Sequence, residues 1–314
     1  MPSVVFSNKL IAANRWQYSN RHSNAALKHT ETFGSQFNQR SLRLASNSMS
    51  SNSMVLTKVD ESTGYARVTL NRAPVNGLNL EMLTCITDTI RNLEQSKVRG
   101  MILSSTFINK VFCAGLDISE MINPNPERLR TFWMALQNMW VKLYGSTMHT
   151  AAIINGHSPA GGCLLAMACD YRIMFPNFTI GLNENALGIV VPAWLQLNMQ
   201  EIIGPRRRAL ACDTAKLFNT HEAFEINLID EIAHSMEDAD RKAVSYLNIF
   251  QTMPDFARTK TKLQLRNRVI DDFQNYRDQD TQRFMKNVMN PAFQNGLAAF
   301  MDALKQRSSQ KNHN

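Results

Sequence analysis

Short apolar runs alternate with helical repeats along the first half of the chain, and this order predicts an α/β core. Val55–Lys58 and Tyr65–Leu70 have the pattern of strands and are separated by a turn that contains glycine. Apolar residues in Leu80–Leu93 recur at helical spacing after Asn79, a favourable N-cap, and Met101–Leu103 is then a short apolar strand. A strand, a helix and another strand in succession predict a βαβ unit.

Helices dominate toward the C-terminus. A helix is expected to begin after Pro124 and Pro126, with an apolar face from Leu129 to Leu143 and with Gly145 closing it. Short buried strands and one short apolar helix are expected after it, at Ala151–Ile154, Cys163–Cys169, Tyr171–Met174 and Phe178–Ile180. From about residue 192 the pattern is helical, and the last predicted helix begins with Asn290 as N-cap and Pro291 at its first position.

Charge divides the chain into a leader and a body. The formal net charge is +8 over 314 residues, but residues 1–53 hold six Lys or Arg and one acidic residue. The remainder holds 28 basic and 25 acidic side chains, which is close to neutral and disfavours a nucleic-acid-binding protein. The leader is rich in Ser and Asn, as mitochondrial transit peptides are, although a generic disordered tail has a similar composition. We expect a leader over residues 1–53, an α/β core over residues 54–235, and a helical region over residues 236–314 for oligomerisation and pocket closure.

The spacing of cysteine and histidine indicates no metal or redox centre. The five cysteines have no zinc or redox spacing and are interpreted as reduced packing residues: Cys85, Cys113, Cys163, Cys169 and Cys212. His221-Glu222 lacks the second histidine of a zinc-binding helix. No apolar run reaches the roughly 18–20 residues of a membrane-spanning helix, so no membrane span is expected.

Three segments place small residues at the junction of a strand and a helix: Val111–Met121, Ile154–Cys163 and Ile180–Gly188. Small residues allow a ligand to approach the backbone closely. A helix that starts at Gly161 would leave unpaired N–H groups at the positive end of its dipole, which is a site for an oxyanion. Each segment alone is explained as well by close packing.

Together and in this order, the segments resemble the crotonase (enoyl-CoA hydratase/isomerase) superfamily, and among its branches the mitochondrial Δ3,Δ2-enoyl-CoA isomerases. The likeness extends from Val55 to Leu304. The motifs that carry it are Pro74-Val-Asn76, Phe112-Cys-Ala-Gly-Leu-Asp117, Pro159-Ala-Gly-Gly-Cys163, Cys169-Asp-Tyr-Arg172 and Gly181-Leu-Asn-Glu184. The resemblance implies an α/β fold with a crotonase-like ββα spiral core and a helical C-terminal region. It also implies a homotrimer or a pair of trimers.

The resemblance further implies roles for individual residues. In the superfamily two backbone N–H groups bind the thioester oxygen, and they match Leu116 and Gly161. The acid–base group of the isomerases matches Glu184. The expected contacts with the substrate and its CoA are Ala114, Gly115, Leu116, Asp117, Ile118 and Gly161. No metal or redox cofactor is implied, because CoA arrives as part of the acyl thioester substrate.

Leu164 favours isomerisation over hydration. The hydratases of the superfamily carry two glutamates that handle a water molecule, and this chain has Leu164 in place of one of them. A leucine cannot deprotonate water, whereas moving a double bond needs only one group that takes a proton from C2 and returns it to C4. Apolar neighbours predict a dry acyl pocket that raises the pKa of Glu184: Leu182, Leu187, Ile189, Val190, Val191, Pro192 and Trp194.

Several alternatives remain open at this point. Taken alone, Glu184 is compatible with a surface turn, His157 with a solvent-facing or capping side chain, and Asp117 with a helix cap. The rival functions are another acyl-CoA enzyme of the superfamily, such as a dienoyl-CoA isomerase or a hydrolase, and a non-catalytic CoA- or RNA-binding protein on the same scaffold. The acyl-CoA chemistry and the basic leader together predict the mitochondrial matrix.

Overall fold

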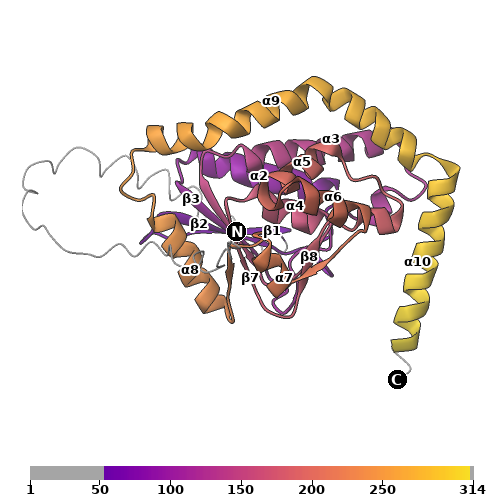
Figure 1. The fold of residues 1–314 in the computed structure, drawn as a ribbon, viewed down its shortest axis with the longest axis horizontal. Helices are drawn as coiled ribbons and strands as arrows, with labels where there is room; N and C mark the ends of the chain where they lie inside the picture. Colours follow the sequence, from indigo (N-terminus) through magenta and orange to yellow (C-terminus); the bar gives the residue numbers. More distant parts are fainter. Residues whose placement is uncertain (1–52, 312–314) are drawn as a thin grey trace, which may run out of the picture.

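The computed structural model describes residues 53–311, with side chains as far as Asp302 (Figure 1). The expected transit peptide, residues 1–53, lies outside the described residues except for Ser53. The larger of two sheets contains, in spatial order, β1 (Val55–Val59), β2 (Tyr65–Leu70), β3 (Gly100–Ser105), β5 (His149–Ile154), β7 (Tyr171–Met174) and β10 (Glu231–Ile232). β1 pairs with β2 in antiparallel fashion, and every later pair in this sheet is parallel.

Successive residues of the larger sheet face two different cores. On β3, Met101 and Leu103 belong to the main core, whereas Ile102 between them belongs to a second core. On β5, Ile154 faces the main core and Ile153 the second. Since neighbouring side chains of a strand point to opposite faces, both faces of this parallel sheet are buried, as is usual for such sheets. The second core is closed by α8 (Met236–Asn248) through Ala239, Ala243 and Leu247.

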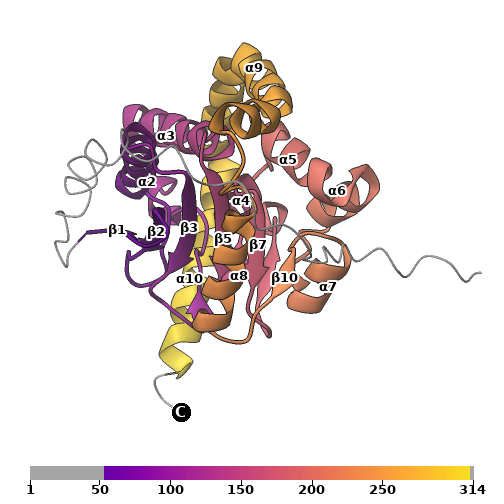
Figure 2. The ribbon, with the colours of Figure 1, turned by 90° about the vertical axis from the view of Figure 1, so that its left-hand side faces the viewer.

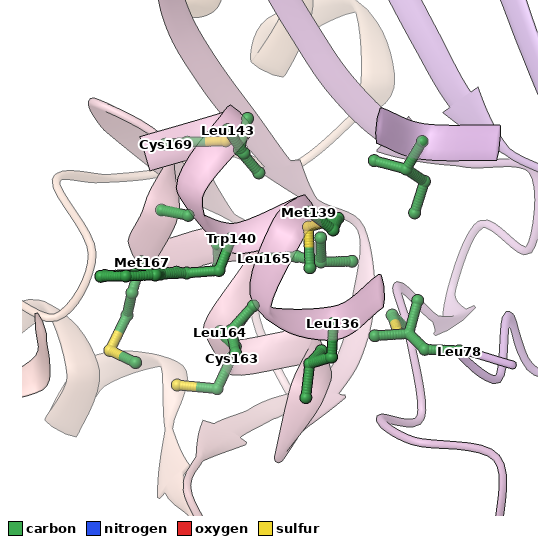
Figure 3. Packing of buried hydrophobic residues seen from close by; sticks show 14 of the residues in the cluster. Leu78, Leu136, Met139, Trp140, Leu143, Cys163, Leu164, Leu165, Met167 and Cys169 are labelled. Atoms are coloured by element: carbon green, nitrogen blue, oxygen red, sulfur yellow. The ribbon is translucent and has the colours of Figure 1, made fainter. Parts of the chain in front are cut away.

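Helices cover the main core in layers (Figures 1 and 2). α2 (Leu80–Gln95) and α3 (Pro126–Tyr144) pack on each other, and α4 (Gly161–Ala168) packs beneath α3. Every residue of α4 is buried, which explains its uniformly apolar sequence. Figure 3 shows Leu164, Leu165 and Met167 of α4 beside Leu136 and Trp140 of α3.

A smaller sheet positions the segments with candidate chemistry. Its strands, in spatial order, are β4 (Lys110–Val111), β6 (Gly156–Pro159), β8 (Thr179–Gly181) and β9 (Phe218–Asn219). β4, β6 and β8 run parallel, and β9 is antiparallel to β8. β6 approaches β4 so closely that a Cβ at Gly156 would lie 2.4 Å from Val111 N, so only glycine fits there.

The C-terminal half is helical, as predicted. It contains α5 (Ala193–Ile203), α6 (Pro205–Asp213), α7 (Thr220–Glu225), α8, α9 (Asp255–Val288) and α10 (Pro291–Lys311), with the short strands β9 and β10 among them. Figure 1 shows α9 running across the top of the molecule above α3 and α5, and α10 turning away from its end. Among residues 53–311, no helix is both long and apolar enough to cross a membrane.

Asp280 ties α9 to the core, and Asp280→Ala is expected to reduce the free energy of unfolding by about 2–4 kcal/mol. The buried Asp280 carboxylate accepts hydrogen bonds from Trp133 Nε1 (2.8 Å), Gln137 Nε2 (2.8 Å) and Trp194 Nε1 (3.3 Å). Its loss leaves three buried donors without this acceptor. Denaturant titration measures the change, with the exposed Asp271→Ala on the same helix as a control expected to stay within about 0.5 kcal/mol. Equal unfolding midpoints for the two variants would contradict this role.

Candidate active site

The candidate site lies where three parallel strands of the smaller sheet end. Leu116 follows β4, Gly161 follows β6 and Glu184 follows β8, and these strands are immediate neighbours. Because parallel strands end at the same edge of a sheet, the three residues are brought to one side of it. The short strands β4 and β6 were not predicted. The three segments that hold Leu116, Gly161 and Glu184 were singled out from the sequence.

The N–H group of Leu116 points away from the backbone that holds its loop. Leu78 N–H donates to Gly115 O (2.8 Å), and Asp117 N–H donates to Leu78 O (3.0 Å). A trans peptide places its N–H opposite its C=O, so the Leu116 N–H is directed away from Leu78. Among the described residues it has no hydrogen-bond acceptor. It is therefore free to bind a ligand.

The N–H group of Gly161 points out of the N-terminus of α4. Leu164 N–H donates to Ala160 O (3.0 Å) as the first hydrogen bond of the helix, and Gly161 N–H lies on the opposite side of that same peptide. No residue of the described part of the chain accepts a hydrogen bond from it. The helix dipole adds positive potential at this end. Ala160 has φ +48° and ψ −117°, a conformation costly for alanine and found mostly where a binding site requires it.

The two N–H groups belong to backbones in direct contact. A Cβ built at Gly115 would lie 3.1 Å from Gly161 N, and a Cβ built at Gly161 would lie 3.1 Å from Gly115 Cα. Gly115 also has φ +92°, which favours glycine. The absence of side chains at both positions allows the amides of residues 116 and 161 to approach each other. Two free donors on adjoining backbones are what an oxyanion site requires.

Glu184 is a buried carboxylate without a partner. Its residue is 6% exposed, and Oε2 has no hydrogen bond with any described residue. Burial raises its pKa from the ordinary value of 4.5 to about 7, opposed only by a hydrogen bond from its own backbone. This contradicts the alternative of a solvated surface turn. A carboxylate with a pKa near neutrality can both accept and return a proton.

Glu184 lies close to the helix that carries the second amide. Burial raises the pKa of the Cys163 thiol on α4, and the charge of Glu184 adds to that effect. Burial also raises the pKa of the Cys212 thiol, and the charge of Glu184 adds to this effect. The backbone is held here by Asn185 Nδ2, which donates to Cys212 O (2.8 Å), and by Ile189 N–H, which donates to Glu184 O (3.1 Å). The turn that carries Glu184 is thus held against α6, and the charge of its carboxylate acts on thiols of both α4 and α6.

The other predicted site residues have clear positions. In the Ala114–Ile118 segment Ala114 is exposed, and Leu116, Asp117 and Ile118 are half-buried, so a ligand can reach them. Asp117 caps a 3₁₀ turn, η1 (Ile118–Glu120), through Ser119 N–H (3.1 Å) and binds Arg72 Nη2 (2.7 Å). This confirms the capping alternative for its carboxylate, while its contact with CoA stays a prediction.

Leu164 and His157 offer no second acid–base group at the site. Leu164 is 1% exposed and belongs to the main core. His157 is exposed on β6, and its Nδ1 accepts a hydrogen bond from Thr179 N–H (3.3 Å). The expectation of a solvent-facing histidine is confirmed. No cluster of three or more His, Cys, Asp or Glu side chains within residues 53–311 is arranged to hold a metal ion.

A pocket of about 520 Å³ lies beside the Glu184 turn, η2 (Glu184–Leu187). It lies between Gly188–Ala193, Trp133 of α3, the end of α9 and Phe293 of α10. Four residues of the predicted acyl pocket line it, Ile189, Val190, Val191 and Pro192. Three others, Leu182, Leu187 and Trp194, do not line it, and Leu182 and Trp194 are fully buried in the main core.

Two polar residues near the site were not identified from the sequence. Ser158 Oγ, at the end of β6, and Asn183 Oδ1, next to Glu184, are buried and have no hydrogen-bond partner among the described residues. Their residue types are common in turns, so no sequence signal marked them. Buried oxygens without partners are rare and are characteristic of binding sites.

Comparison with known proteins identifies the family. The sequence profile described as enoyl-CoA hydratase/isomerase matches residues 60–311. The mitochondrial enoyl-CoA delta isomerase 1 of Rattus norvegicus is 39% identical, with 82% of this chain and 89% of that protein covered. The Homo sapiens protein of the same name is 36% identical, with 80% and 84% covered. The crystal structure of human mitochondrial delta3-delta2-enoyl-CoA isomerase superposes with a TM-score of 0.78 at 36% identity, covering 81% of this chain and 99% of that one. The predicted crotonase-type α/β fold is thereby confirmed, and the chain belongs to the enoyl-CoA hydratase/isomerase family.

Proposed function

We propose that this protein is an isomerase that converts 3-cis- or 3-trans-enoyl-CoA to 2-trans-enoyl-CoA in the β-oxidation of unsaturated fatty acids. The observation that carries the proposal is the buried, unpartnered carboxylate of Glu184 after β8, on the sheet edge where the free N–H groups of Gly161 and Leu116 follow the neighbouring strands β6 and β4. The names of the rat and human relatives support the same activity.

The geometry supports a proton shuttle. The two N–H groups bind the thioester oxygen, and the ionised Glu184 takes a proton from C2 of the 3-enoyl chain. The resulting dienolate carries its negative charge on the thioester oxygen, where the two amides and the N-terminus of α4 stabilise it. Glu184 then returns the proton to C4, and the double bond moves between C2 and C3. A group with a pKa of about 7 is suited to both steps.

Hydration is disfavoured because the position of the second hydratase glutamate is Leu164, a buried apolar side chain. A dienoyl-CoA isomerase or a hydrolase would also need a further acid or a group that positions water. The purified chain without residues 1–53, incubated with 3-cis- and 3-trans-enoyl-CoA, is expected to form conjugated 2-trans-enoyl-CoA. Given 2-trans-enoyl-CoA, it is expected to form little 3-hydroxyacyl-CoA. Rapid hydration with no isomerisation would reverse the assignment.

The kcat/KM for isomerisation is expected to rise with pH and to reach half its plateau near pH 7. The base must be ionised, and the raised pKa of Glu184, about 7, means that activity is lost as the pH falls through this value. An ordinary glutamate would give a midpoint near its ordinary pKa of 4.5. Initial rates at low substrate concentration between pH 5 and 9 measure the profile. A flat profile across this range would contradict the assigned base.

We also propose that Ala114–Ile118 contacts CoA and that the pocket beside η2 takes the distal acyl chain. The half-buried surface of the first segment and the apolar lining of the pocket by Ile189 and Val191 support these roles. Residues 236–314 would close the pocket through Phe293 of α10. No metal or redox cofactor enters the proposed steps.

The mitochondrial matrix is the proposed location, supported by the mitochondrial names of the relatives and the basic leader. A homotrimer is the proposed assembly. Phe256 and Leu265 on α9 are 76% and 73% exposed, and Ile249 before it is 56% exposed, which leaves apolar side chains available for subunit contacts. Light scattering after size-exclusion chromatography distinguishes a trimer from a monomer or a hexamer.

A further inference from the structure

The Pro74-Val-Asn76 motif lies between β2 and α2, and the proposed proton transfer assigns it no role. Asn76 is 0% exposed and has φ +52°. Its side-chain hydrogen bonds are all made within the protein. Oδ1 accepts from Arg72 N–H (2.8 Å), and Nδ2 donates to Ser105 Oγ (2.8 Å) and to Phe112 O (2.9 Å). The Phe112 bond reaches the segment that leads to the first oxyanion amide.

We propose that Asn76 is a positioning residue that, with Ser105, holds the Phe112–Asp117 segment so that Leu116 N–H faces the substrate's thioester oxygen. The inference rests on the proposed function, because it assigns Asn76 to the same oxyanion site. Asn76 is fully buried and its side chain is bonded to Arg72 N–H, Phe112 O and Ser105 Oγ, so it acts through Leu116 and not on the substrate.

Contacts continue from Asn76 along the segment toward Leu116. Cys113 Sγ–H donates to Asn76 O (3.1 Å), and Ala114 N–H donates to Val75 O (3.0 Å). The hydrogen bonds of Leu78 to the residues on either side of Leu116 then orient its amide. The loop that contains Asn76 thus holds the Phe112–Asp117 segment in place through these hydrogen bonds.

Ser105 connects the Asn76 loop to the larger sheet. It is the last residue of β3 and is 2% exposed. Its Oγ accepts from Asn76 Nδ2 (2.8 Å) and from Phe107 N–H (3.0 Å), and it donates to Val111 O (2.8 Å). Because β3 is central in a sheet buried on both faces, the network fixes the Leu116 loop relative to the rigid part of the molecule. A displacement of about 1 Å at an oxyanion donor reduces turnover about 100-fold.

The test uses Asn76→Gly, because glycine accepts a positive φ and only the side-chain hydrogen bonds are lost. The matched control is Asn227→Gly, an exposed asparagine with φ +62° in a turn after α7. Ser105→Ala is a second, milder variant that breaks the same network. Two measurements are made on each purified protein: steady-state isomerisation, and the infrared carbonyl stretch of bound octanoyl-CoA, a saturated thioester that cannot react.

We expect Asn76→Gly and Ser105→Ala to lower kcat about 10- to 100-fold with a KM changed less than about threefold. The carbonyl stretch of bound octanoyl-CoA should move back toward its value in water, because the amide of residue 116 polarises it less. Asn227→Gly should match the wild type in both measurements. A purely structural role would lower the unfolding midpoint and leave the carbonyl stretch of the bound ligand unchanged.

Wild-type kcat and carbonyl stretch in a folded Asn76→Gly variant would overturn the inference. If Asn76→Gly does not fold, the same two values in Ser105→Ala decide it. The proposed function is tested separately by the wild type. A wild-type protein that polarises octanoyl-CoA but does not isomerise 3-enoyl-CoA would refute the isomerase while leaving the positioning of the amide intact.

Discussion

Glu184→Gln is expected to lower kcat by about 10²–10⁴-fold while leaving KM for 3-enoyl-CoA nearly unchanged. Glutamine keeps the size of the side chain but cannot accept a proton at neutral pH. The oxyanion donors at Leu116 and Gly161 are backbone groups, so ground-state binding of the thioester is preserved. Glu184→Asp, which retains a carboxylate but withdraws it by one methylene, should lose less activity. Assays of conjugated product measure both.

The same substitution is expected to stabilise the fold at neutral and alkaline pH. The folded-state pKa of Glu184, about 7, exceeds its ordinary value of 4.5, so the folded protein binds this proton more tightly than the unfolded chain. Stability therefore falls as pH rises from the lower value through the higher one, and the penalty above pH 7 is about 3 kcal/mol. Glutamine carries no charge and avoids it. Denaturant titrations at pH 5 and pH 8 should show the variant gaining much more stability over the wild type at pH 8 than at pH 5.

Opposite changes in activity and stability distinguish a catalytic role from a structural one. Glu225→Gln, an exposed glutamate at the end of α7, is the control and should change neither. A Glu184→Gln protein that is both active and no more stable at pH 8 would falsify the assignment of the base.

Gly162→Ala is expected to reduce kcat about 100-fold or more and to lower stability by about 1–3 kcal/mol. A Cβ at this position would lie 2.2 Å from Cys113 O and 3.0 Å from Ser158 Oγ. The first contact is with backbone and is not relieved by a rotamer change. The Cys113 peptide must move away from α4, which separates the Leu116 amide from the Gly161 amide. Kinetics and denaturant unfolding together measure the two effects.

Gly296→Ala provides the matched control on α10. No atom lies within 4 Å of the Cβ that would be added, and the residue is helical. Alanine should therefore raise helix stability by about 0.5–1 kcal/mol without affecting kcat. If Gly162→Ala behaved like this control, the close approach of the two segments would not matter for catalysis.

The longer helices and strands were predictable because the spacing of their apolar residues follows which side chains are buried. The strand pair formed by β1 and β2, the N-cap Asn79 and the N-terminal proline of α10 are all present. The candidate site residues were predictable from motif resemblance, and Glu184 is buried as expected. Periodicity alone would not have found them, since a glutamate in a turn carries no signal of its own burial.

The rest depends on contacts between distant residues. β4 has only two residues, Lys110–Val111, which is too short for any period to be visible. Asp170 and Arg172, from one of the motifs, form ion pairs whose partners are elsewhere in the sequence. Asp170 binds Lys262 and Arg266 of α9 (2.8 Å each), and Arg172 binds Asp230 (3.0 Å). The Asp170 pairs arise from the packing of α9 and the Arg172 pair from the residue before β10, and neither has a local sequence signal.

The placement of Leu116, Gly161 and Glu184 after three neighbouring strands has a consequence for how such enzymes diversify. Two of the three contributions are main-chain amides, which depend on the course of the backbone and on no functional side chain. In the proposed mechanism, activation of the thioester is therefore inherited with the backbone, and the side chains at positions such as 164 and 184 decide the fate of the activated carbon. One framework can acquire a new reaction through one or two codon changes, without rebuilding the part that binds the acyl group.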